Sequence, residues 1–483
     1  MMLSRAHIVF IALEIVSFIA VIFAIYFFGP SENQHKLKYA REEKQLEQTD
    51  PLVLDDLARC SYKGLYDEIT SQCKCFQCQS GPFCLTSVEN CVLDATSANP
   101  VMYEIYWASL SASSTSNSES NMELDNTYSK LTVPHDWRIG HYQFDNGMKD
   151  DKHYSSPELE AAIRSLHNHV ENADTENHEL VIGVGSTQLT HAALFALEKK
   201  IRNAGKINDH SVGIGNTMKV TARSPYYDEH RLSAEFLPGM HWVDWSEIQK
   251  TPLKSCAVEI ITMPGNPDAT MMDHPSSPCD YIVYDHAYYW PQYTPILKKV
   301  NDDIMLFTLT KLTGHAGSRI GWAWVKDPEI AQYMRDFINL LNHGVPHESQ
   351  IRASFLLKHL MKKKRGLIEW ATEEMENRWN RLENILEHTN RFKLEKRLGP
   401  MHDLFNDKSR IASPAYLWMK CNWKKDLKNA DGSCQRFLLN SVNIIGRDGQ
   451  MYGGKFSLQA ICFEIYNLYQ SVFQVLANIL ISL

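Results

Sequence analysis

Residues 308–323 read TLTKLTGHAGSRIGWA, and this stretch carries the strongest indication of both fold and chemistry. It continues an apolar run at 304–308 that has the composition of a buried strand. A lysine placed just past such a strand, Lys311, is an unusual choice for structure. Partial desolvation lowers the pKa of the amine and frees it as a nucleophile for Schiff-base chemistry. The glycine-bearing segment that follows ends in Arg319, whose guanidinium is able to bind a phosphate with two parallel hydrogen bonds. His315 in the same segment is interpreted as a loop or packing residue rather than a general base.

The sequence on both sides of this stretch alternates between strand and helix patterns. Short apolar runs at 180–185, 257–263 and 281–284 each end at a glycine or a polar turn, and 190–200 has helical periodicity. This succession predicts an α/β fold with a parallel sheet covered by helices. Residues 326–395 are expected to be mostly helical. Strands return from about 411 to 446, which indicates a second, smaller α+β domain.

Ligands of such sheets bind beyond the carboxyl ends of the strands, and reactive residues follow several of these ends. Gly185, Ser186 and Thr187 come directly after the first strand and open a helix, where free backbone N–H groups bind anions. A plain helix N-cap at Ser186 or Thr187 is the alternative interpretation. Asp285 follows the strand at 281–284, where an unpaired carboxylate would be costly.

These parts together predict a site for pyridoxal 5′-phosphate (PLP). That cofactor needs a phosphate-binding turn, a lysine for its Schiff base and a carboxylate facing the pyridine nitrogen. Each unit by which Asp285 raises the pKa of the ring nitrogen corresponds to about 1.4 kcal/mol. Asn266 and Tyr288 are candidates to hydrogen-bond the ring hydroxyl oxygen.

Three segments resemble the plant alliinase and tryptophan aminotransferase-related family. They are Asn-Pro-Asp at 266–268, YDHAYYWPQYTP at 284–295 and the stretch at 308–323, and the resemblance runs from about residue 58 to about 455. It implies the type I fold of PLP-dependent transferases, with a large sheet domain and a small domain. It also implies a homodimer whose cofactor site is completed by the partner subunit.

The resemblance assigns a role to each candidate residue. Lys311 is the catalytic lysine, Asp285 the partner of the pyridine nitrogen, and Asn266 and Tyr288 the ligands of the ring oxygen. Ser186, Thr187, Thr310 and Arg319 hold the phosphate, Tyr142 reaches the phosphate of the neighbouring subunit, and Tyr226 stacks on the ring. Two departures from the family pattern, Ala269 for glycine and Thr310 for serine, are expected to be tolerated.

Six of the eleven cysteines lie between positions 60 and 91, and no histidine accompanies them there. An even count after a membrane-entry segment favours disulfides over a zinc site. A module this short needs cross-links to fold. The spacing resembles the family's EGF-like domain, which implies the pairs Cys60–Cys73, Cys75–Cys84 and Cys78–Cys91. The resemblance also implies a Cys421–Cys434 bridge in the small domain.

The N-terminal segment 8–28 is apolar apart from Glu14 and Ser17. Its length matches a hydrocarbon core of about 30 Å. Bulky residues at its end favour an uncleaved transmembrane helix over a cleaved signal peptide, which remains the alternative. The expected organisation is a cytosolic stub (1–7), the transmembrane anchor (8–28), a stalk (29–57), the cysteine module (58–93), the PLP domain (94–455) and an apolar tail (456–483). The catalytic domain would then face the lumen of the secretory pathway, at the endoplasmic reticulum membrane.

The tail departs from the family. After Gly453-Gly454-Lys455 the family continues into a strand with an arginine that binds the substrate carboxylate, whereas here no Arg or Lys follows to Leu483. Arg447 is the only nearby guanidinium, in a Gly-Arg-Asp-Gly segment that is typical of a turn. We therefore expect this chain to retain PLP and to turn over amino acids poorly.

The sequence predicts a transaminase that acts on an L-amino acid, possibly tryptophan or another aromatic one, with a 2-oxo acid acceptor. An alliinase-type carbon–sulfur lyase acting on S-alkyl-cysteine sulfoxides shares the first chemical steps. The absence of any Asn-x-Ser/Thr sequon is slight evidence against a freely secreted lyase. A catalytically impaired, EGF-bearing interaction protein is the third alternative. The net charge of −8 argues against a nucleic-acid partner.

Overall fold

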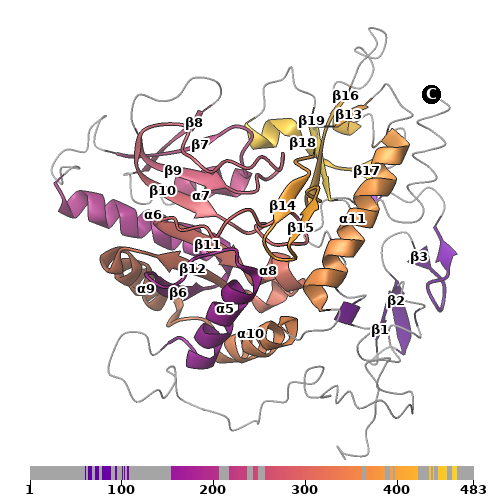
Figure 1. Cartoon of the computed structure of the whole chain (residues 1–483), viewed down its shortest axis with the longest axis horizontal. Helices are drawn as coiled ribbons and strands as arrows, with labels where there is room; N and C mark the ends of the chain where they lie inside the picture. The colour runs from indigo at the N-terminus through magenta and orange to yellow at the C-terminus, as the bar shows by residue number, and fades with distance from the viewer. Residues whose placement is uncertain are drawn as a thin grey trace, which may run out of the picture.

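The computed structural model consists of a large domain built on one sheet, a smaller domain and a cysteine-rich module (Figure 1). It describes residues 60, 64–67, 71–75, 79–88, 93–94, 101, 103, 106–107, 154–205, 217–236, 243–248, 256–361, 366–386, 392–394, 397–421, 434–436, 439, 444–453 and 460–464.

The large sheet has seven strands in the order β6-β12-β11-β10-β9-β7-β8. Their bounds are β6 Glu179–Gly183, β7 Met218–Arg223, β8 Val243–Ile248, β9 Cys256–Thr262, β10 Cys279–Asp285, β11 Ile304–Thr308 and β12 Gly321–Val325. The strands from β11 to β8 are parallel to their neighbours, as predicted.

One strand corrects the prediction of a parallel sheet. β12 is antiparallel to both β11 and β6, so the sheet is mixed. Between β11 and β12 lies only the five-residue helix α8 (Leu309–Thr313) and a short loop. Such a helix is about 8 Å long. It is too short to return along a five-residue strand of about 17 Å, so the chain reverses direction instead.

Helices cover both faces of the sheet, because alternate side chains of each strand are buried on opposite sides. On β11, Ile304 and Leu306 join one core cluster, whereas Met305 and Phe307 join the other. The first cluster includes helices α6 (Gly185–Asn203), α7 (Asp228–Phe236) and α9 (Pro328–Asn342). The second includes α5 (Pro157–Val170), α10 (His347–Leu360) and α11 (Leu367–Leu386). Burial on both faces explains the continuous apolar runs of the sequence.

The small domain contains a four-stranded sheet in the order β13-β16-β19-β18. Its bounds are β13 Phe392–Leu394, β16 Tyr416–Cys421, β18 Arg447–Asp448 and β19 Ala460–Glu464, with a hairpin of β14 (Met401–Asp403) and β15 (Lys408–Arg410) beside it. β19 corrects our expectation that the tail after 455 replaces a strand of this domain, since it pairs with both β16 and β18. Arg447 lies in strand β18, opposite Cys462, and not in a turn.

The cysteine module has two short antiparallel pairs, β1 (Gly64–Asp67) with β2 (Gln72–Cys75) and β3 (Gln79–Ser80) with β4 (Thr86–Ser87). Two predicted disulfides, Cys60–Cys73 and Cys75–Cys84, are present. The sulfur atoms of three of these cysteines cluster within 4.8 Å, but as oxidised pairs they are not available as metal ligands. After the module, β5 (Leu93–Asp94) pairs in parallel with β17 (Ile444–Ile445) of the small domain.

The other predicted disulfides are described only in part. Cys78 and Cys91 lie outside the described residues. Cys434 is disulfide-bonded, and the side chain of Cys421 is not described. An unpredicted disulfide, Cys256–Cys279, joins the first residues of the neighbouring strands β9 and β10.

Within the described ranges, no helix is long and apolar enough to cross a membrane. The predicted anchor at 8–28 and the stalk at 29–57 lie outside those ranges, so both remain predictions.

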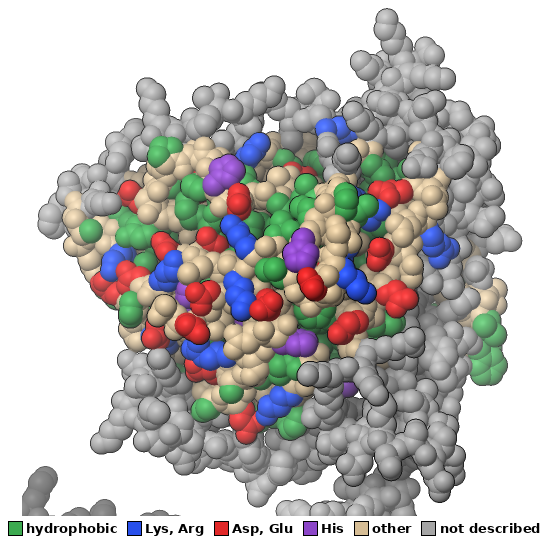
Figure 2. All heavy atoms as spheres, viewed as in Figure 1, with side chains coloured by type: hydrophobic (Ala, Val, Ile, Leu, Met, Phe, Trp, Pro, Cys, Tyr) green, Lys and Arg blue, Asp and Glu red, His purple; other side chains and the backbone are tan. Residues whose placement is uncertain are grey.

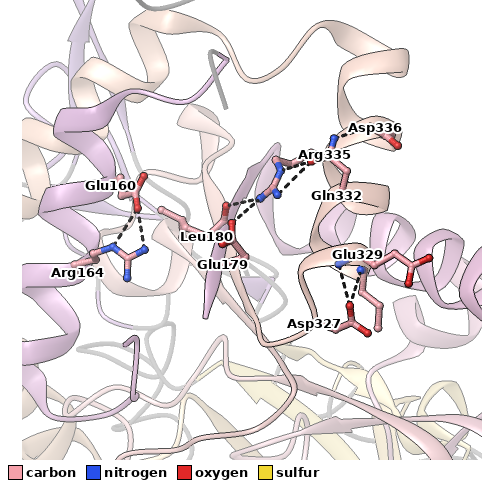
Figure 3. Close-up of polar contacts among 10 residues, drawn as sticks. Glu160, Arg164, Glu179, Leu180, Asp327, Glu329, Gln332, Arg335 and Asp336 are labelled. Carbon is pink, nitrogen blue, oxygen red and sulfur yellow. Dashed lines mark hydrogen bonds and ion pairs between the residues drawn. The ribbon is translucent and has the colours of Figure 1, made fainter. Parts of the chain in front are cut away.

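Charged side chains hold α9 against the edge of the large sheet (Figure 3). Arg335 donates to Glu179 Oε2 and to the Leu180 carbonyl oxygen, each at 3.4 Å. Asp327 caps the N-terminus of α9 and forms an ion pair with Lys200 of α6 at 2.9 Å. Figure 2, viewed from the same side as Figure 1, shows acidic and basic side chains interspersed over the described part of the surface that faces the viewer. The Arg335 contact gives a partner to one backbone carbonyl of β6, a strand at the edge of the sheet, where backbone groups are otherwise open to pairing with another strand.

Candidate active site

The carboxyl ends of five strands, β6, β7, β9, β10 and β11, bring the predicted site residues to one edge of the large sheet, with the antiparallel β12 between β6 and β11. In chain order, the site residues at these ends are the first turn of α6 after β6, Tyr226 after β7, Asn266 after β9, Asp285 as the last residue of β10 and Lys311 after β11. The structure therefore brings together residues separated by more than a hundred positions, as the α/β pattern predicted.

Lys311 lies in the middle of α8, directly beyond β11. Thr308 caps this helix through its side chain, and Gly314 ends it with a φ of 80°. The Lys311 side chain is half-buried, and its Nζ lies 5.5 Å from the centroid of the Tyr288 ring. The short, capped helix thus directs the amine toward the aromatic residue that follows β10.

Asp285 is the last residue of β10 and is buried. Its Oδ1 accepts from the Ala287 amide at 3.1 Å, and its Oδ2 lies 3.7 Å from His230 Nε2. The same histidine nitrogen is 2.8 Å from Thr262 Oγ1. Burial lowers the pKa of His230 below its usual value, although the nearby Asp285 charge opposes this. A neutral His230 orients Asp285 without cancelling its charge, which leaves that charge to act on a protonated ring nitrogen.

His230 was not predicted from the sequence. It lies on α7, four residues after Tyr226, and reaches Asp285 only through the packing of α7 against the sheet. The signal in the sequence was a histidine on a helix that follows the end of a strand. Strand β7 was not among the predicted strands, so this signal was missed.

Gly185, Ser186 and Thr187 form the first turn of α6, and Arg319 lies against this turn. Arg319 Nη2 is 3.5 Å from the Val184 carbonyl oxygen, and a Cβ on Gly185 would lie 2.7 Å from the same nitrogen. A Cβ on Gly321 would lie 2.8 Å from the Ser186 amide nitrogen. The backbone of both segments therefore comes together closely enough that only glycine fits.

The helix begins at Gly185, two residues earlier than an N-cap at Ser186 would require. The N-cap is Val184, which makes no side-chain hydrogen bond, so the plain N-cap interpretation of Ser186 and Thr187 is wrong. Their amides lie in the unsatisfied first turn, with the Arg319 guanidinium beside them, which is the arrangement that binds a phosphate. Thr310 is buried in α8, next to Lys311.

Asn266 and Tyr226 line a cavity of about 90 Å³, together with Arg223, Thr262, Asp268 and Met272. Asn266 is buried, and its Oδ1 has no hydrogen-bond partner among the described residues. Tyr226 is buried edge-on against Trp245, with ring centroids 5.2 Å apart. A buried amide with an unused polar atom is costly unless a ligand satisfies it, which favours a ligand at this position.

The hydroxyl of Tyr288 contacts the hydroxyl of Tyr416, which comes from β16 of the small domain. Their rings pack edge to face at 5.2 Å. Tyr416 was not predicted as a site residue, and it makes the small domain part of this edge. His315 packs against Trp107, and its Nδ1 lies 3.1 Å from the Thr313 carbonyl oxygen, in agreement with the packing interpretation. Tyr142 lies outside the described residues.

Residues 93–479 match the family model described as Allinase. The chain belongs to the allinase family. The match extends beyond residue 455, the end of the resemblance expected from the motifs, and so includes β19. The cysteine module before residue 93 lies outside it, so its EGF-like character remains a prediction.

Curated relatives fall into two groups by name. Tryptophan aminotransferase-related protein 3 of Arabidopsis thaliana is 30% identical over 79% of this chain and 77% of its own length. Tryptophan aminotransferase-related protein 1 of Oryza sativa is 31% identical over 75% and 77%. Alliin lyase 1 of Allium sativum is 28% identical over 80% and 76%.

Among solved structures, substrate-bound BacF of Bacillus subtilis has a TM-score of 0.54 at 13% identity, covering 81% of this chain and 90% of its own. Tyrosine aminotransferase of Leishmania infantum has a TM-score of 0.52 at 13% identity, covering 81% and 91%. These similarities show the type I fold of PLP-dependent aminotransferases, as predicted.

PLP is the cofactor of this allinase-family chain, as predicted, and the residues of the site fit it. The first turn of α6 and Arg319 would hold the phosphate, and Asp285 the ring nitrogen. Asn266 would offer its unsatisfied Oδ1 to the ring substituents, and Lys311 would offer its amine for covalent attachment.

Proposed function

We propose that this protein is a PLP-dependent aminotransferase that moves the amino group of an L-amino acid to a 2-oxo acid. The observation that carries the proposal is the convergence of Lys311 and Asp285 at the ends of the adjacent strands β11 and β10. When bound, PLP supplies an electron sink for the electrons of the substrate Cα–H bond. Three relatives at 30% identity or more are named as tryptophan aminotransferase-related, which favours transamination and an aromatic substrate.

The residues of the chain divide the work between them. Asp285 keeps the ring nitrogen protonated, and His230 holds the Asp285 carboxylate in place. Lys311 Nζ would take the proton from the substrate carbon and hold it as the general acid–base group of the site. Arg319 and the α6 turn fix the phosphate, so that the reacting atoms stay aligned with the amine.

Arg223 is the proposed partner of the substrate carboxylate. It is the cationic residue among those that line the Asn266 and Tyr226 cavity. From the sequence, only Arg447 had been considered as a replacement for the missing family arginine, and Arg223 had been overlooked. Its side chain is exposed, and its Nη1 makes a weak contact with Met272 Sδ at 3.7 Å. Arg447 is the rival, since its charge acts on Tyr227 close to Asp285. Replacing the true partner with glutamine should raise KM for amino acid and 2-oxo acid alike by about tenfold or more. It should leave the reaction of an amine without a carboxylate unchanged.

A carbon–sulfur lyase is the second candidate, because alliin lyases of three Allium sources match over a similar length at 28% identity. The test is one purified protein with two sets of substrates. Transfer of the amino group from an aromatic amino acid to a 2-oxo acid, without pyruvate from cysteine sulfoxides, supports the proposal. Pyruvate release alone would establish the lyase instead, and neither product would support the impaired, interaction-only alternative.

We also propose that the catalytic domain faces an oxidising lumen and is a homodimer. Three disulfides in the described residues favour an oxidising compartment. Protease treatment of sealed microsomes should spare the domain from about residue 29 onward. Digestion without detergent would refute this topology, and a monomeric mass in light scattering would refute the dimer.

A further inference from the structure

The main chain of Lys311 is held in an unusual way. α8 ends two residues after the lysine, and Gly314 donates to the Thr310 carbonyl oxygen. The next amide, that of His315, is directed to Thr313 Oγ1 at 3.5 Å, so it does not continue the helix. Carbonyl groups in the last turn of a helix lack intrahelical partners and need others.

Three buried side chains supply those partners to the Lys311 carbonyl oxygen. Tyr103 and Tyr293 donate their hydroxyls at 2.8 Å each, and Gln292 Nε2 lies at 3.4 Å. The two hydroxyl oxygens are 3.3 Å apart, and Gln292 also donates to Tyr103 Oη at 2.9 Å. An amide N–H donates only, so Tyr103 accepts from Gln292 and directs its own hydrogen toward the lysine carbonyl.

The surroundings keep this arrangement rigid. Tyr103, Gln292 and Tyr293 are each at most 1% exposed. A Cβ on Gly314 would lie 2.7 Å from the Cβ of Tyr103, so the tyrosine packs directly on the end of α8. Burial raises the pKa of Tyr103 well above its usual value, and its hydroxyl therefore stays protonated and remains a donor. Two short hydrogen bonds occupy both lone pairs of the carbonyl oxygen.

We propose that Tyr103, Gln292 and Tyr293 form a carbonyl clamp that positions Lys311 for its chemistry. With the main chain fixed, the amine moves between cofactor and substrate only by rotating its own side-chain bonds. The clamp also makes Tyr103, which precedes the large domain in sequence, part of the support of the active site. This inference rests on the proposed PLP chemistry at Lys311.

The test compares hydroxyl deletions that differ only in what they support. The Tyr103→Phe/Tyr293→Phe variant loses both short donors of the clamp. Tyr289→Phe is the matched control, because its buried hydroxyl donates to the Lys298 carbonyl at 2.9 Å and accepts from the Leu297 amide, away from Lys311. The readout is the pH titration of the absorbance band of the bound cofactor, together with the melting temperature.

The clamp predicts a shift of at least about 0.5 unit, or threefold, in the apparent pKa of the cofactor band in the double variant. Tyr289→Phe should lower the melting temperature while the titration curve stays at its wild-type position. An unmoved titration in the double variant, or an equal shift in the control, would overturn the clamp. If the double variant does not fold, the single Tyr103→Phe variant decides by the same criterion. A wild-type protein without any cofactor band would instead reject the proposed function.

Discussion

Two regions of the large domain bury polar side chains, and they do so in opposite ways. In the interior, His167 has no exposed surface and both ring nitrogens are paired, Nδ1 with Asn172 Oδ1 at 2.7 Å and Nε2 with Trp322 Nε1 at 2.9 Å. Asn172 in turn donates to the Tyr289 carbonyl oxygen at 2.8 Å. At the carboxyl edge of the sheet, by contrast, Asn266 Oδ1 is buried without a partner in the described part of the chain.

The contrast concerns these two groups and not the whole interior, since Trp290 Nε1 and Trp324 Nε1 beside His167 also lack a partner among the described residues. A saturated network stabilises the fold and offers nothing to a ligand. An unsaturated buried group costs free energy in the empty protein, so it is expected where a ligand completes it. Substitutions in the His167 network should therefore change stability alone, and substitutions at the edge or in the clamp beneath Lys311 should change cofactor binding, titration or rate.

Lys311→Ala is the edge substitution with the largest expected effect. Removing the amine abolishes covalent attachment of the cofactor and the proton transfers at the substrate carbon, which lowers kcat by about 10²–10⁴-fold or more. The melting temperature of the cofactor-free protein should hardly change, because the side chain is only half-buried. Borohydride reduction followed by peptide mapping provides the second measurement. Labelling of Lys298, an exposed lysine paired with Asp273, in place of Lys311 would show that the site is misassigned.

Gly185→Ala should weaken cofactor binding by about tenfold. The new Cβ would lie 2.7 Å from Arg319 Nη2 and displace the guanidinium from the α6 turn. Gly205→Ala is a matched control, since Gly205 has a similar φ of 71° but nothing within 4 Å of the added atom. Both variants carry the strain of a side chain in the left-handed backbone region, about 1–2 kcal/mol. The dissociation constant of PLP, measured by fluorescence, should rise in the first variant alone; an equal rise in both would leave Arg319 without a special role.

The interior network should respond to pH through stability. Burial lowers the pKa of His167 to about 3, far below its ordinary value of 6.5. Between these values the unfolded chain binds a proton that the folded chain does not. Stability is therefore complete above about pH 6.5 and falls as the pH decreases, by up to about 1.4 kcal/mol per pH unit from this residue. Thermal melts at pH 7 and pH 5 should show a smaller difference for His167→Gln than for the wild type. An unchanged difference would mean that other groups cause the acid sensitivity.

Sequence patterns could predict the edge because its residues follow strand ends in short, recognisable segments. Asp285, Asn266 and Lys311 each lie within four residues of the end of a strand that the apolar runs located. His230, Tyr416 and Tyr103 could not be found in this way, since each reaches the site through long-range packing of a helix, a second domain or an N-terminal segment. The reversed direction of β12 and the Cys256–Cys279 disulfide likewise depend on which strands become neighbours, and the runs do not encode that order.

The smallest effect is expected at the surface, where neither kind of burial applies. Lys200 of α6 forms ion pairs with Asp327 and Glu329 at the start of α9, and its hydrogen bond to Glu329 is the main cause that raises its pKa. All three side chains are partly exposed, so water and salt screen their attraction. Lys200→Met should lower the free energy of unfolding by less than about 1 kcal/mol, and this loss should diminish further in 1 M salt.

Arg335→Met is the informative companion, because the Arg335 side chain is only 11% exposed and donates to the β6 carbonyl of Leu180 as well as to Glu179. It should lower the melting temperature more than Lys200→Met does, with little dependence on salt, while kcat/KM stays at the wild-type value in both variants. If Lys200→Met proved as damaging as Arg335→Met, or if either altered the cofactor titration, the division between surface, interior and edge would fail.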